Sequence, residues 1–93
     1  MRTIERTGSF KRDYKHVLSN PRHRDAEELF VELLKLLVED AVLEPRYRDH
    51  ALAGEWKDHR DCHVKPDLVL IYRKPNDSVL QLVRIGSHSE LGL

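Results

Sequence analysis

The sequence predicts one α+β domain spanning residues 1–93, with two N-terminal helices packed on a mostly antiparallel four-stranded sheet. Helical spacing of apolar residues is confined to the region between residues 9 and 40. Extended apolar runs separated by turn residues fill residues 55–85, and one more short run precedes the first helix. The expected order of elements is therefore β-α-α-β-β-β.

The first two elements are a short strand and a helix. The strand is expected over residues 2–6 and is closed by the turn residues Thr7-Gly8-Ser9. Ser9 is a suitable N-cap for the helix, because apolar residues follow it at helical spacing, namely Phe10, Tyr14, Val17 and Leu18. Asn20-Pro21 ends this helix, since the residue before a proline avoids the α conformation.

The second helix is expected from Asp25 to about Asp40, and it is apolar around about two-thirds of its circumference. One apolar stripe is suited to the sheet and contains Ala26, Leu29, Phe30, Leu33 and Leu37. The neighbouring stripe contains Val31, Leu34, Val38 and Ala41. This second stripe faces either the first helix, which is the simpler arrangement, or a partner protein.

The second half of the chain is expected to form the rest of the sheet. Residues 41–55 are an irregular connection, marked by Pro45 and Gly54. Residues 55–64 and 68–73 are a hairpin turned by Lys65-Pro66-Asp67, and the apolar run 68–72 is typical of a central strand. A further turn leads to a strand over residues 79–85 and a short tail.

Composition limits the class of protein. The net charge is zero, yet residues 1–24 carry a balance of +5 and residues 25–44 a balance of −6. These two segments either pair with each other or leave a basic face for a ligand. The single cysteine excludes an internal disulfide, and no segment resembles a secretion leader or a membrane span. We therefore expect a cytoplasmic protein, complete as it stands, with no membrane partner.

The segment from Asp49 to Asp67 contains three histidines and five acidic residues where a strand and turn are expected. Strand alternation places Lys57, His59, Asp61 and His63 on one face and Trp56, Asp58, Arg60 and Cys62 on the other. Neither face is apolar throughout, as a core face should be. A strand that departs from folding logic in this way is typical of a functional site.

Four polar side chains are candidates for that site. His63 and Asp67 bracket the tight turn, so their side chains can approach each other at one end of the sheet. His50 precedes the strand in the irregular segment, and His88 follows the last strand. Histidine exchanges protons near neutral pH, and a carboxylate can orient it or act as a base.

Three chemistries can use such a cluster. The spacing of the four candidates matches no metal motif, so neither a metal nor another cofactor is expected. Cys62 projects away from its neighbour His63, which favours an inert, packed thiol. Acid–base cleavage of RNA remains, with positive charge from Lys57, Arg60 and Arg84. Salt bridges to Asp58 and Asp61 are an equal alternative for those cations.

Several of these residues together resemble one family. The matching positions are Tyr47-Arg48-Asp49-His50, Leu52, Gly54, Trp56-Lys57, Arg60-Asp61, His63, Pro66-Asp67, Leu70-Ile71-Tyr72 and Arg84-Ile85-Gly86-Ser87-His88-Ser89-Glu90-Leu91. The pattern is similar to the YafQ branch of the RelE/ParE toxin superfamily. It covers nearly the whole second half, and the expected order of elements agrees with a RelE-like fold.

The resemblance implies the toxin of a bacterial type II toxin–antitoxin system, a ribonuclease that cuts mRNA in the ribosomal A site. It implies a cognate antitoxin, contact with 16S rRNA, and operator DNA bound only through the antitoxin complex. It implies metal-free transphosphorylation by His50, His63, Asp67 and His88. His50 or Asp67 is expected as the base, His88 as the acid, and His63 as an orienting or phosphate-stabilising group.

Two features depart from the family pattern. The chain ends Leu91-Gly92-Leu93, without an aromatic residue that can stack on an mRNA base. The net charge is low for a nuclease that acts on the ribosome, although Arg2, Arg6, Lys11, Arg12 and Lys15 offer a local basic face. The alternative function is a non-catalytic protein of the RelE/ParE fold that inhibits gyrase or only regulates through its antitoxin.

Overall fold

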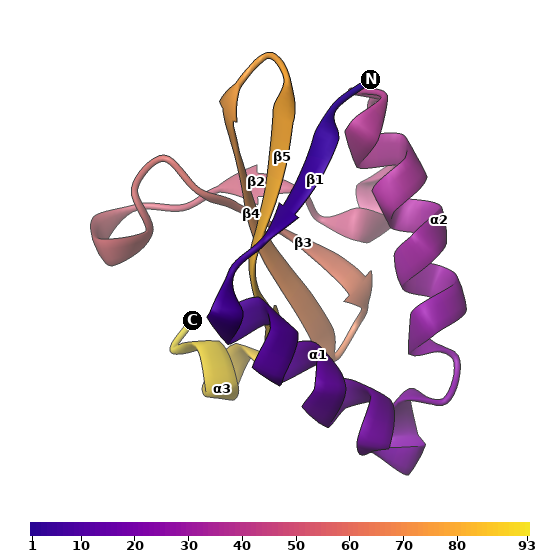
Figure 1. Ribbon diagram of the computed structural model, residues 1–93. Coiled ribbons are helices and arrows are strands. Elements are labelled where there is room, and N and C mark those ends of the chain that lie inside the picture. Colours follow the sequence, from indigo (N-terminus) through magenta and orange to yellow (C-terminus); the bar gives the residue numbers. More distant parts are fainter.

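Five strands form one sheet in the order β1-β5-β4-β3-β2, and all neighbours are antiparallel except the parallel pair β1 and β5 (Figure 1). The computed structural model describes all 93 residues. The strands are β1 (Thr3–Arg6), β2 (His50–Ala51), β3 (Arg60–Lys65), β4 (Leu68–Asn76) and β5 (Val79–Gly86). The helices are α1 (Gly8–Ser19), α2 (Ala26–Val38) and α3 (His88–Leu91), with short 3₁₀ turns η1 (Pro21–His23), η2 (Pro45–Tyr47) and η3 (Gly54–Trp56).

The predicted α+β class is confirmed, but the sheet has five strands where four were predicted. The additional strand is β2, which lies inside the segment predicted as an irregular connection. It pairs with β3 at only two positions, His50 with Asp61 and Ala51 with Arg60. So short a strand has no alternating pattern of its own, and its pairing depends on the neighbouring strand.

The main core lies between the sheet and the two N-terminal helices, which cover the same face (Figure 1). It joins Phe10 of α1 and Leu33 of α2 to buried strand residues such as Leu70 and Leu82. The predicted central strand is confirmed, because residues 68–72 of β4 are all buried.

The helix starts differ slightly from the prediction. Thr7, not Ser9, caps α1, and its Oγ1 accepts a hydrogen bond from the Phe10 backbone N–H at 3.0 Å. The chain leaves β1 at Arg6, so Thr7 is the first residue placed to cap a helix that buries Phe10. Asp25 precedes α2 as predicted, but its side chain makes no capping hydrogen bond. It forms an ion pair with Lys65 instead, at 2.8 Å.

The second apolar stripe of α2 is only partly covered by α1. Leu34 lines a surface depression together with Phe10 and Tyr14 of α1. Val31 is 44% exposed, and it lines an open apolar groove of about 260 Å³ together with Ile4 of β1. The prediction that the first helix covers this stripe is therefore only partly correct, because α1 packs chiefly against β5.

The third strand, β3, begins at Arg60, five residues later than predicted. Residues 54–56 form η3 instead, and the backbone there adopts positive φ angles at Gly54 (66°) and Asp58 (68°). A strand cannot continue through such left-handed residues. The tail after β5 is also more regular than predicted, because Ser87 and Glu90 form a capping box that starts α3. No helix is both long and apolar enough to cross a membrane.

Candidate active site

The two faces of β3 have different surroundings. Cys62 and Val64 are buried in the core beneath the helices. Asp61 and His63 alternate with them and therefore point to the opposite face, which the two long helices do not cover. On that face a small apolar cluster forms from Val69 and Ile71 of β4 and Leu91 of α3. The predicted alternation is thus confirmed from residue 60 to residue 63.

His50 and Asp61 are cross-strand neighbours at the edge of the sheet. The His50 Nδ1 atom lies 2.9 Å from Asp61 Oδ1 and 2.9 Å from the Arg48 carbonyl oxygen. Its N–H is aligned with the carbonyl, so the contact with Asp61 is electrostatic and leaves Oδ1 without a hydrogen bond. The Asp61 side chain is only 3% exposed, whereas that of His50 is 58% exposed. This arrangement leaves Nε2 of His50 free to accept a proton.

His63 and His88 form the second half of the cluster. Their ring centroids are 5.1 Å apart, with 56° between the ring planes. His63 is buried on β3, and His88 is exposed as the first residue of α3. The capping box fixes that helix start, because Ser87 Oγ accepts from the Glu90 N–H at 3.1 Å and Glu90 Oε1 accepts from the Ser87 N–H at 2.9 Å.

The electrostatics of these groups are coupled. Burial raises the pKa of Asp61, and the positive charge available on His50, His63 and His88 acts in the opposite direction. Burial also lowers the pKa of His63, and the neighbouring His88 lowers it further. The three histidines therefore share one buried carboxylate, and His63 is the ring that resists protonation. Perturbed groups of this kind are typical of functional sites.

The predicted site residue Asp67 does not join this cluster. It lies in the turn between β3 and β4 with its side chain 47% exposed, and its charged neighbour is Arg22 of η1, at 3.9 Å. No hydrogen bond or ion pair connects it to a histidine. The structure places His50, His63 and His88 in one region, as expected from the sequence. Asp61 was expected only as a salt-bridge partner. The period of two between Asp61 and His63 is the signal that identifies the missing residue.

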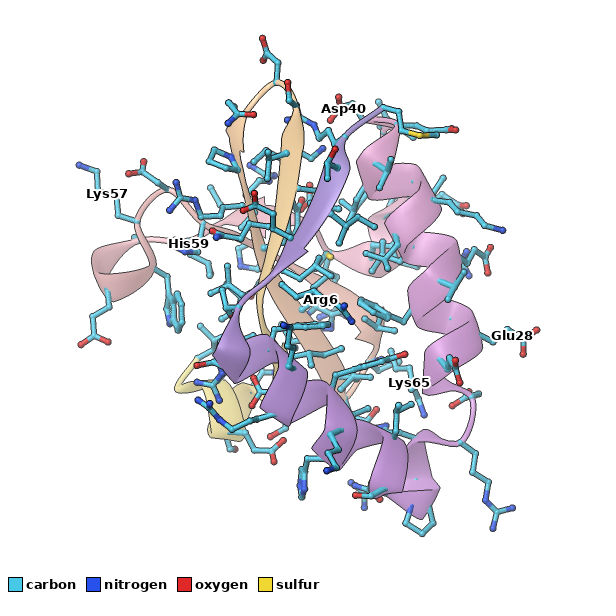
Figure 2. The ribbon with its side chains drawn as sticks, in the orientation of Figure 1. Arg6, Glu28, Asp40, Lys57, His59 and Lys65 are labelled. Atoms are coloured by element: carbon cyan, nitrogen blue, oxygen red, sulfur yellow. The ribbon has the colours of Figure 1, made fainter.

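The predicted RNA-binding cations fall into two groups. Arg84 and Arg60 are held by carboxylates of the same chain: Arg84 Nε lies 2.6 Å from Asp13 Oδ2, and Arg60 Nη2 lies 3.0 Å from Asp49 Oδ2. Lys57 projects from the loop at η3, away from the sheet (Figure 2). Three cations of α1 are also exposed, namely Lys11, Arg12 and Lys15. No group of three or more histidine, cysteine or acidic side chains is arranged to hold a metal ion.

Comparison with known proteins identifies the family of this chain and agrees with its fold. The sequence model of the family described as "Bacterial toxin of type II toxin-antitoxin system, YafQ" matches residues 2–92. The mRNA interferase toxin YafQ of Escherichia coli K12 is 42% identical over 91 residues, which cover 97% of this chain and 95% of the relative.

Solved structures of YafQ are also similar to this chain. The crystal structure of YafQ from E. coli BL21(DE3) has a TM-score of 0.85 at 37% identity, and 98% of each chain is covered. The toxin in the E. coli DinJ–YafQ complex has a TM-score of 0.83 at 38% identity, again over 98% of each chain. The chain therefore belongs to the YafQ family of bacterial type II toxin–antitoxin toxins.

Proposed function

We propose that the protein is a ribosome-dependent endoribonuclease that cleaves mRNA in the A site and so inhibits translation. The observation that carries this proposal is the grouping of His50, His63 and His88 around the buried carboxylate of Asp61. Cleavage of RNA without a metal needs one group that takes up a proton and another that releases one. A cluster of histidines with different surroundings supplies both.

The family relationship supports the same activity and its regulation. The E. coli relative is named an mRNA interferase, and the DinJ–YafQ complex is described as a toxin–antitoxin complex. We accordingly propose a cognate antitoxin for this chain, with operator DNA contacted only through the complex of the two proteins. Action on ribosomes also implies a cytoplasmic location. We further propose a single catalytic domain over residues 1–93, which is supported by the family match over residues 2–92.

His50 is the proposed general base. Its Nε2 takes the proton of the 2′-hydroxyl, and the resulting oxygen attacks the adjacent phosphorus. The bond from phosphorus to the 5′-oxygen then breaks, which leaves a 2′,3′-cyclic phosphate. The Asp61 carboxylate, 2.9 Å from the opposite ring nitrogen, stabilises the imidazolium that forms on His50. A positioned base of this kind contributes roughly 10²–10⁴ in rate.

His88 is the proposed general acid, because it is exposed at the start of α3 where a leaving group can reach it. It donates a proton to the 5′-oxygen as the bond to phosphorus breaks. His63 is proposed to stay neutral, since its lowered pKa disfavours a charged ring. A neutral imidazole donates one hydrogen bond, which suits the orientation of the phosphate between His50 and His88.

Asp67 is the alternative base, as the family motif implies. Its carboxylate is directed to Arg22, so this function requires a change of side-chain rotamer when RNA binds. For RNA binding we propose the exposed cations Lys57, Lys11, Arg12 and Lys15, with Arg60 and Arg84 contributing only if their carboxylate partners release them. Leu91 is buried against the sheet, so its side chain is not available to contact an mRNA base in place of an aromatic residue.

The competing function is a non-catalytic RelE/ParE-fold protein that inhibits gyrase or acts only through its antitoxin. A cleavage map on ribosomes programmed with a defined mRNA separates these functions. We expect A-site cleavage by the wild type and none by His63→Ala or His88→Ala. Intact mRNA with the wild type contradicts the nuclease. Loss of DNA supercoiling activity in a gyrase assay then supports the competing function.

A further inference from the structure

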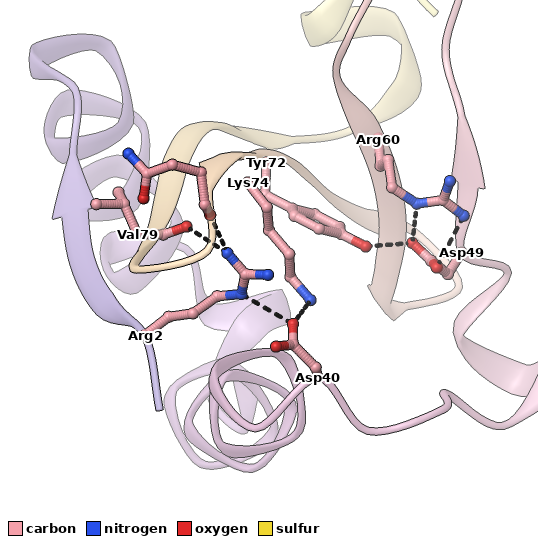
Figure 3. Close-up of polar contacts among 8 residues, drawn as sticks. Arg2, Asp40, Asp49, Arg60, Tyr72, Lys74 and Val79 are labelled. Carbon is pink, nitrogen blue, oxygen red and sulfur yellow. Dashed lines mark hydrogen bonds and ion pairs between the residues drawn. The ribbon is translucent and has the colours of Figure 1, made fainter.

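The residue next to His50 is held by three hydrogen bonds from the core side of the sheet. Asp49 Oδ1 accepts from the Tyr72 hydroxyl at 2.5 Å and from Arg60 Nε at 3.3 Å. Asp49 Oδ2 accepts from Arg60 Nη2 at 3.0 Å, so the carboxylate lies between the two donors (Figure 3). Tyr72 is 98% buried in β4 and is therefore a fixed anchor.

Strand alternation connects this contact to His50. Arg60 and Tyr72 are cross-strand neighbours on the face beneath the helices, where Tyr72 joins the main core. Asp49 points to that face, and His50 follows it on the opposite face beside Asp61. Because β2 is a two-residue strand paired only with β3, few backbone hydrogen bonds hold it. The Asp49 carboxylate adds side-chain hydrogen bonds to β3 and β4 directly before His50.

The backbone of Arg48, the residue before Asp49, is in an unfavourable conformation. Arg48 has φ 47° and ψ 41°, a left-handed conformation that is unfavourable for a residue with a Cβ atom. Its carbonyl oxygen accepts the hydrogen bond from His50 Nδ1 at 2.9 Å. If Asp49 is released, Arg48 is free to return to a right-handed conformation, and its carbonyl then turns away from the His50 ring.

We propose that Tyr72, Asp49 and Arg60 are positioning residues that fix the side chain of His50 for proton transfer. None of the three touches the reacting atoms, and the catalytic significance of the contact rests on the proposed function. Arg60 acts here through Asp49 and not through RNA. Burial, together with the hydrogen bond to Asp49, raises the pKa of the Tyr72 phenol, which therefore remains a hydrogen-bond donor at every physiological pH.

Tyr72→Phe is the most informative variant, because it removes only the hydroxyl and leaves the buried ring in place. We expect single-turnover cleavage to slow roughly 10- to 100-fold with KM changed by about twofold or less, as for misplacement of a catalytic group. Asp49→Ala should give the larger loss, and Asp49→Asn should retain part of the rate because its amide oxygen still accepts from Tyr72.

Two further measurements separate positioning from a general loss of stability. The control is Val17→Ala, which truncates a buried residue of α1 far along the chain from β2. We expect it to lower the melting temperature while leaving both the cleavage rate and the NMR signals of the His50 ring unchanged. Tyr72→Phe should shift those ring signals while leaving the signals of the core methyl groups largely as they are.

The outcome is decided by the His50 signals even if the chain is not a nuclease. Unchanged His50 ring signals in Tyr72→Phe overturn the positioning proposal, whatever the cleavage rate. Shifted signals accompanied by slower cleavage support it. If the wild type itself does not cleave mRNA on ribosomes, the proposed function fails, while shifted His50 signals still establish that Tyr72 and Asp49 hold this side chain.

Discussion

Replacing Asp61 with asparagine separates the two effects of a carboxylate buried beneath a histidine. The carboxylate is 3% exposed, and its charged partner His50 is 58% exposed and partly screened by water. An ion pair with one exposed partner contributes about 0–1 kcal/mol to folding, whereas taking a carboxylate out of water costs several kcal/mol. The raised pKa of Asp61 has the same cause. The charge at this position therefore lowers the free energy of unfolding.

The expected result for Asp61→Asn is a gain in stability of about 1 kcal/mol near pH 7.5, smaller than the removed charge cost because the amide also lacks full hydrogen bonding. For a domain of this size, that gain corresponds to a melting temperature higher by roughly 4–8 °C. The pKa of Asp61 is raised in the folded state, so the cost of the charge appears as pH rises through that pKa. The two proteins should therefore converge in stability as pH falls towards the ordinary aspartate value of 3.8.

The same variant should be nearly inactive. The neutral amide of asparagine removes the charge that stabilises the imidazolium, although the Arg48 carbonyl still holds the Nδ1–H of His50. We expect kcat for mRNA cleavage to fall by roughly 10²–10⁴, the range for loss of a positioned acid–base group. Thermal denaturation between about pH 3.5 and 7.5, combined with single-turnover cleavage, measures both effects.

Asp77→Asn is the matched control, because Asp77 is exposed in the turn between β4 and β5. It should change neither the melting temperature nor the cleavage rate. An Asp61→Asn protein that is less stable than the wild type at neutral pH, or that cleaves at the wild-type rate, refutes the reasoning.

Three further predictions concern neighbouring groups. Because the pKa of His63 is lowered in the folded state, the unfolded chain takes up a proton at this residue more readily. The free energy of unfolding should therefore fall as pH drops below 6.5, and His63→Gln should flatten that dependence in thermal melts. Equal slopes for the two proteins would count against this prediction. Ser87→Ala removes the cap of α3 and should lower the free energy of unfolding by about 1 kcal/mol. It should also slow cleavage about tenfold, because the cap fixes the helix start that carries His88. The control Ser89→Ala, at an exposed position, should change neither quantity. Burial raises the pKa of the Cys62 thiol, so the native protein should resist alkylation by iodoacetamide. Mass spectrometry measures the labelling, and rapid labelling would contradict the packing described for this residue.

Elements with strong periodicity or clear turn residues were predicted well. The apolar run of β4, the helix stop at Asn20-Pro21 and the alternation of Cys62 with His63 all appear in the structure. These features depend on neighbouring residues in the chain, so local sequence is sufficient to predict them. The two-residue strand β2 was not predicted, because it is a strand only through its pairing with β3 and has no sequence pattern of its own.

The site was predicted in part for the same reason. Sequence patterns identified His50, His63, Asp67 and His88 as candidates, but Asp67 lies outside the cluster, beside Arg22, and its function stays a prediction. They did not identify Asp61 as the shared carboxylate, nor the pairing of Arg60 with Asp49 and of Arg84 with Asp13. Each of those contacts joins elements that are distant in the chain or in separate strands.

By itself, the sequence determined the fold class, the order of the main elements and the residue types available for acid–base chemistry. Those properties follow from local periodicity, turn preferences and side-chain pKa values, which each segment carries wherever it lies. Only the tertiary structure decided which histidines share a carboxylate, which cations are already paired and which side chain anchors His50. These outcomes depend on burial and on distances of a few ångströms between separate elements, and burial is the cause of the shifted pKa values at Asp61 and His63.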